Sequence, residues 1–89
     1  MNVPEEFQRL TRCFWNGSHR DAATPEQWIA RAAGLNSPEQ LAVCRAFLNE
    51  LLVQADVEEL QLAWRSGGCS YGLPDDKIRG FLEKVRDLI

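Results

Sequence analysis

Apolar residues recur at spacings of three and four along most of this chain, and that spacing constrains its fold more than any other feature. Such a period places apolar side chains on one face of an α-helix. The three clearest stripes are Phe7, Leu10 and Phe14; Leu41, Cys44, Leu48, Leu51 and Leu52; and Ile78, Phe81, Leu82, Val85, Leu88 and Ile89. Nowhere do four or more residues alternate in the manner of a strand. The sequence therefore predicts an all-α protein.

Signals for helix starts and ends divide the chain into five helices. Thr24–Gln27 and Ser37–Gln40 each place a hydroxyl at the N-cap, a proline at the first helical position and a glutamine at the capping-box position. Asp56–Glu59 is an acidic form of the same start. Because 89 residues have room for one core, we expect a compact single-domain bundle of about five short helices over residues 1–89.

The expected ends of these helices are marked by glycine and by turn residues. We expect the first helix to begin at Pro4. Helix ends are expected at Asn16-Gly17-Ser18, Gly34 and Gly67-Gly68, and the last loop is expected to run from Gly67 to Asp76.

The whole chain has a net charge of −3, and its negative charge is concentrated in one segment. Residues 50–76 carry six carboxylates against one arginine, residues 1–49 are balanced, and residues 77–89 have two positive charges in excess. An acidic segment of this kind repels a phosphate backbone and attracts a basic surface. We therefore expect no direct binding of nucleic acid.

The single histidine and the three cysteines offer little for catalysis or metal binding. The cysteines form neither a close pair of metal ligands nor an even-numbered disulfide framework, and Cys44 falls within an apolar stripe. The nucleophiles near His19 lack a glycine elbow and a distant acid. The carboxylates of Glu58-Glu59 and Asp75-Asp76 point about 100° apart on a helix, so neither pair is an acid–base dyad. We expect no enzyme, no cofactor and no metal.

Two kinds of residue in the acidic segment have both a structural and a functional interpretation. Asp56 and Glu59 can cap a helix, whereas the cap does not use Glu58. Tyr71, the only tyrosine, lies in the glycine-containing loop. It can anchor a partner protein, or it can pack as a lid over the bundle with its hydroxyl group in water.

Four short motifs give the chain a family resemblance. They are Leu48-Asn49-Glu50-Leu51-Leu52, Glu58-Glu59-Leu60, Gly68-Cys69-Ser70-Tyr71 and Ile78–Val85. Together they resemble the small immunity proteins of bacterial contact-dependent growth inhibition systems. In that pattern an acid–leucine helix leads to an acidic helix, a Gly-Cys-x-Tyr turn and a last helix with an aromatic–leucine pair, where Phe81 stands in place of tryptophan.

The resemblance implies a non-enzymatic function. The partner would be the C-terminal toxin domain of a cognate contact-dependent growth inhibition effector, commonly a nuclease with a basic cleft, which the acidic surface would occupy as a phosphate mimic. Charge complementarity would speed association, and an aromatic anchor would supply the buried centre of the interface. We expect the binding residues to be Glu50, Glu58, Glu59, Tyr71, Asp75 and Asp76.

The alternative is a helical adaptor or regulatory subunit that binds a partner helix in an apolar groove lined by Trp15 or Trp64. The first residues lack the features of a secretory signal, and no apolar run approaches the roughly 20 residues of a membrane span, so we expect a cytoplasmic chain without membrane contact. The oligomeric state stays open, because an apolar helical face can also pair with itself.

Overall fold

The computed structural model describes residues 2–15 and 17–89, and for Asp21 the backbone alone. Within these residues the regular structure is entirely helical, which confirms the all-α prediction and the number of α-helices. The elements in chain order are α1 (Glu5–Arg12), the 3₁₀ helix η1 (Ser18–Asp21), α2 (Pro25–Ala33), α3 (Pro38–Gln54), α4 (Val57–Arg65) and α5 (Asp75–Leu88).

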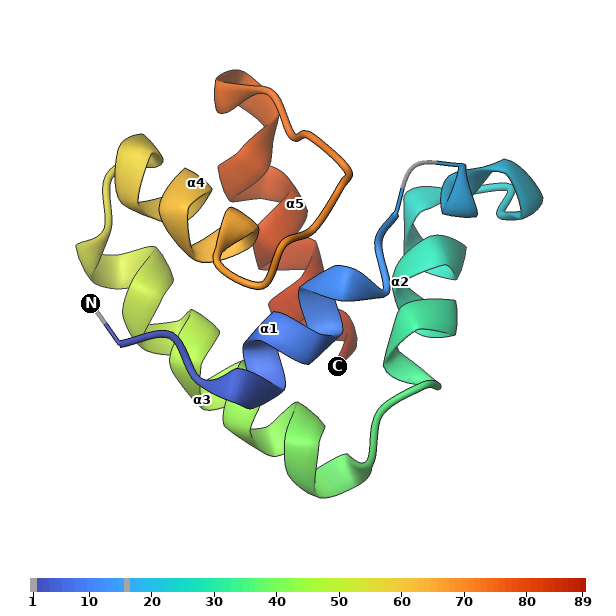
Figure 1. Ribbon diagram of the computed structural model, residues 1–89, viewed down its shortest axis with the longest axis horizontal. Coiled ribbons are helices and arrows are strands. Elements are labelled where there is room, and N and C mark those ends of the chain that lie inside the picture. The colour runs from blue at the N-terminus through green and yellow to red at the C-terminus, as the bar shows by residue number, and fades with distance from the viewer. Residues whose placement is uncertain (1, 16) are drawn as a thin grey trace.

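The last helix is the centre of the bundle. In Figure 1, α5 lies between α4 and α2 and passes behind α1. It packs against α2, α3 and α4, while α1 packs across α3 and touches α4. The shared core includes Phe7, Leu10, Phe14, Ile29, Leu48, Leu60, Trp64, Ile78, Leu82 and Val85, each at most 1% exposed. Residues from all five α-helices therefore form one apolar cluster.

The helix starts follow the capping signals. Ser37 and Asp56 each form a complete capping box, in which the side chain accepts from the backbone N–H three residues later and that residue's side chain bonds back. Thr24 accepts from the backbone N–H of Gln27. The Gln27 side chain, however, accepts from the N–H of Ala23 instead of that of Thr24, so the reciprocal half of the predicted box is displaced by one residue.

Two predicted boundaries are wrong. α1 ends at Arg12 instead of at Asn16-Gly17-Ser18, of which Asn16 lies outside the described residues. The chain leaves the helix early because Phe14, which follows it, turns into the core. The loop before α5 is also shorter than predicted, because Pro74 is the N-cap of α5 and the helix begins at Asp75. Asp75 and Asp76 therefore lie in a first helical turn.

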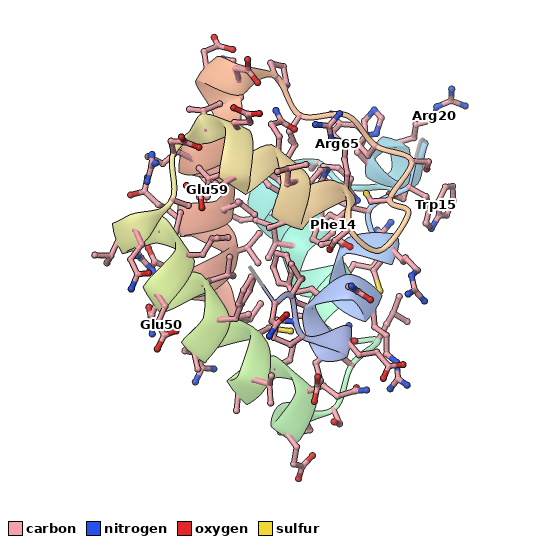
Figure 2. All side chains as sticks on the ribbon, turned by 60° about the vertical axis from the view of Figure 1, so that its left-hand side comes forward. Phe14, Trp15, Arg20, Glu50, Glu59 and Arg65 are labelled. Carbon is pink, nitrogen blue, oxygen red and sulfur yellow. The ribbon has the colours of Figure 1, made fainter. Side chains whose placement is uncertain are left out.

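The adjacent aromatic residues Phe14 and Trp15 point in opposite directions. Phe14 is fully buried and Trp15 is 56% exposed, and Figure 2 shows them pointing respectively into and away from the bundle. None of the described helices combines the length and the apolar character that a membrane crossing requires.

Candidate partner-binding surface

Four of the predicted acidic residues lie together at one edge of the molecule. Glu58 and Glu59 are in the first turn of α4, and Asp75 and Asp76 are in the first turn of α5. Figures 1 and 2 both show these two helix ends side by side. We call Glu58, Glu59, Asp75 and Asp76 the acidic edge.

A hydrogen-bonded glutamine fixes the two helix ends relative to each other. The Gln61 side-chain N–H donates to the Leu73 carbonyl oxygen at 2.6 Å and to Oδ1 of Asp75 at 3.0 Å. Since Gln61 is on α4 and Asp75 begins α5, this side chain links the two helix ends, which also pack against each other directly. Sequence reasoning did not identify Gln61, because its partners lie twelve and fourteen residues further along the chain.

The carboxylates of the acidic edge face solvent. All four residues are exposed, and among the described side chains none of the four forms an ion pair with an arginine or lysine. Glu59 has a structural role as well, because its carboxylate accepts from the Asp56 N–H in the capping box. Glu58 and Asp76 are therefore the residues of the edge most available to a partner.

The arginines Arg65 and Arg79, on the two helices of the acidic edge, donate hydrogen bonds to backbone carbonyls. Arg79 on α5 donates to the carbonyl oxygens of Leu52 at 2.8 Å and of Ala55 at 2.7 Å. Arg65 on α4 donates to the carbonyl oxygen of Gln61 at 3.3 Å. These contacts draw both guanidinium groups to the backbone, so the negative charge of the edge is not cancelled by direct pairing.

Glu50 does not belong to the acidic edge. It is an exposed residue of α3, and Figure 2 shows it on the outer side of that helix, away from Glu59 on α4. The sequence placed Glu50 with the other acids because all of them fall within residues 50–76. The chain turns between α3 and α4, so the two helices run in different directions, and this turn separates Glu50 from the acids of α4.

Tyr71 lies in the connection from α4 to α5, the two helices that carry the acidic edge. This connection is tied down at several points: Arg12 Nε donates to the Gly67 carbonyl oxygen at 2.7 Å, and Trp64 Nε1 donates to the Tyr71 carbonyl oxygen at 2.8 Å. The Cys69 thiol donates to the Phe14 carbonyl oxygen at 3.0 Å. The backbone at Tyr71 is thereby positioned by residues from α1 and α4.

The Tyr71 ring is half-buried against two other rings. Its centroid is 4.8 Å from that of Trp28 and 5.5 Å from that of His19, both in edge-to-face geometry. The ring therefore packs over the bundle, as in the lid interpretation, and keeps an accessible face, as the anchor interpretation requires.

Beside Tyr71 is a groove that the sequence did not reveal. It has a volume of about 740 Å³ and lies between the start of α2, one face of α5 and the connecting loop. We call it the aromatic groove. Its ring-bearing residues are His19, Trp28, Tyr71 and Phe81, and its other lining residues include Thr24, Leu73, Asp76, Lys77, Gly80 and Lys84.

The aromatic groove and the acidic edge share a residue. Asp76 lies in the first turn of α5 and also lines the groove. At the far end, Lys84 on α5 pairs with Glu26 on α2 at 3.0 Å, and this contact lowers the pKa of the Glu26 carboxyl group. One continuous surface therefore combines exposed carboxylates with an apolar hollow.

The tryptophans proposed for a helix-binding groove lie elsewhere. Trp64 is 1% exposed and belongs to the core. Trp15 borders a small hollow of about 130 Å³. Trp28 is instead the tryptophan that lines the large groove. The sequence could not single it out, because its place in the groove depends on the packing of α2 against α5.

Cys13 and Cys69 donate hydrogen bonds to backbone carbonyls, and His19 packs against two aromatic rings. Burial, and secondarily the nearby Glu6, raises the pKa of the Cys44 thiol to about 11, and burial also raises the pKa of Cys69. The Cys13 thiol donates to the Arg9 carbonyl oxygen at 3.4 Å. In the part of the chain that the structure describes, no three His, Cys, Asp or Glu side chains are grouped so that they could hold a metal ion.

Comparisons with known proteins add no relative to these observations. No family model matches the chain, and neither the curated proteins nor the solved structures contain a match.

Proposed function

We propose that this chain is an immunity protein that binds the C-terminal toxin domain of a cognate contact-dependent growth inhibition effector and covers its basic active-site region. One observation carries the proposal: four exposed carboxylates lie on two adjacent helix ends without a cationic partner among the described side chains. The family resemblance, which covers about residues 41–89, gives the class of partner. In this function the chain performs no reaction, requires no cofactor and acts in the cytoplasm of the producing cell.

The electrostatic balance at the edge supports a cationic partner. Each helix N-terminus contributes about half a positive charge, so the ends of α4 and α5 together offset about one of the four carboxylate charges. The remaining negative potential extends into solvent and raises the association rate with a basic surface. Tyr71 and the adjoining groove supply the apolar contact that gives an interface its long lifetime.

The test reverses the two most available charges. The variant Glu58→Lys/Asp76→Lys is expected to bind the effector's C-terminal domain at least tenfold more weakly, because two attractive contacts become repulsive. Its helices should persist, since losing an acid from a first turn costs about 0.3–1 kcal/mol each. Surface plasmon resonance gives the affinity, and thermal unfolding gives the stability.

A matched control separates local contacts from net charge. Glu39→Lys/Asp87→Lys changes the net charge by the same amount, with exposed residues at the start of α3 and near the end of α5. This control is expected to change binding less than threefold. Equal losses in both variants would show that the edge has no special role, and full binding by the first variant would refute the assignment of this surface.

A second candidate function, an adaptor for a partner helix, is favoured by the aromatic groove alone. It would use Trp28, Tyr71 and Phe81 in place of the tryptophans named from the sequence. The two functions differ in how strongly binding should respond to salt.

A further inference from the structure

Charges of opposite sign flank the aromatic groove at both ends. Asp76 and Lys77 are adjacent at one end, and Lys84 is paired with Glu26 at the other. A charged group that entered the groove would therefore gain no net attraction and would lose hydration. The lining between these ends is mostly apolar, and its aromatic residues include Tyr71 and Phe81, both half-buried. The groove is thus suited to an uncharged, apolar occupant.

A glycine on α5 keeps the groove open. Gly80 lines it, in the middle of a fourteen-residue helix where glycine is less favourable than alanine. A Cβ atom at this position would have no heavy atom within 4 Å. Nothing in the chain's own packing therefore requires glycine here. What the missing side chain provides is free space above the helix backbone, which an incoming group can approach closely.

We propose that the aromatic groove receives an apolar side chain, aromatic or leucine-like, from the same basic partner that the acidic edge attracts. This inference rests on the proposed function and adds the chemistry of the partner's central contact. The groove adjoins the edge at Asp76, so one partner surface reaches both. The apolar anchor sits over Gly80, between the rings of Tyr71 and Phe81, and slows dissociation, whereas the edge speeds association.

The test fills the groove from inside. Gly80→Leu is expected to raise the dissociation rate of the complex with the effector's C-terminal domain at least tenfold, because the new side chain takes the anchor's place. The association rate and its salt dependence should stay within twofold of the wild-type values. The melting temperature should be equal or higher, since the space is empty and leucine favours a helix. Gly80→Ala, which adds one methyl group, should show a smaller effect.

The matched control adds the same side chain elsewhere. Ala46→Leu places a leucine on the exposed face of α3 and should leave both rates unchanged. If Gly80→Leu dissociates as slowly as the wild type, the groove is not used, and the proposal fails while the acidic-edge variant still tests the function. A slower association with unchanged dissociation also contradicts the proposal. If the wild-type chain binds no such domain, the function and this inference fail together.

Discussion

Gly67 shows how much of the site's position depends on a single residue. The sequence predicted that the pair Gly67-Gly68 ends α4, and glycine suits such a position because it readily adopts a left-handed conformation. Only Gly68 has that conformation, with a φ of 81°. Gly67 is needed for a different reason: a Cβ atom there would lie 2.7 Å from the Gln8 carbonyl oxygen and 2.9 Å from the Gln8 Cβ. The loop that carries Tyr71 therefore starts in direct contact with α1, a contact that no local pattern encodes.

At this scale we predict that Gly67→Ala lowers the free energy of unfolding by about 1–3 kcal/mol, because the methyl group must push the loop away from α1. Gly72→Ala in the same loop is the control, since its Cβ would meet nothing within 4 Å and its φ is not positive. It should stay within about 0.5 kcal/mol of the wild type. Urea denaturation measures both, and similar losses would show that the contact with Gln8 is easily relieved.

At the scale of the helices, the end of α3 is completed by a residue from another helix. The last carbonyl groups of a helix lack partners within it. α3 has no basic residue in its own last turn, and Arg79 of α5 binds the carbonyl oxygens of Leu52 and Ala55 instead. In the sequence Arg79 counted only toward the basic terminal segment. In the structure, Arg79 joins α5 to the end of α3.

This contact predicts that two arginine substitutions on α5 lower the free energy of unfolding by different amounts. Arg79→Met keeps an unbranched side chain but removes both charge-assisted hydrogen bonds, so we expect a loss of about 1.5–3 kcal/mol in the free energy of unfolding. Arg86→Met removes only an ion pair with the neighbouring Asp87 and should cost less than about 1 kcal/mol. Denaturant unfolding of both variants checks this. An Arg79→Met loss no larger than that of Arg86→Met would mean that water replaces the guanidinium at the α3 carbonyls.

The elements also show what the sequence could predict. The starts of α2, α3 and α4 follow from Thr24, Ser37 and Asp56 because capping bonds join residues three apart. The end of α1 depends on Phe14 turning into a core built from other helices, so no local signal marks it. The same distinction applies to the site. The acids were identifiable from charge, but their grouping without Glu50 and the walls of the groove depend on how separate helices pack.

At the scale of the whole molecule, charge is separated from apolar contact. The exposed carboxylates lie at the ends of α4 and α5, and the aromatic groove extends away from them along α5, with Asp76 common to both regions. Long-range attraction belongs to the first region and short-range packing to the second. Salt weakens the former and leaves the latter nearly unchanged.

This separation predicts how salt distinguishes the two candidate functions. Between about 0.01 M and 0.15 M salt the Debye length falls from roughly 30 Å to 8 Å, so attraction between the acidic edge and a basic partner is largely screened beyond contact. For an immunity protein of the proposed kind, the association rate should fall at least tenfold over this range while the dissociation rate changes little. Stopped-flow mixing with the effector's C-terminal domain measures both rates. Glu58→Lys/Asp76→Lys should flatten the salt dependence. If wild-type association is already flat, binding is driven by the groove, and the adaptor function becomes the better account of the molecule.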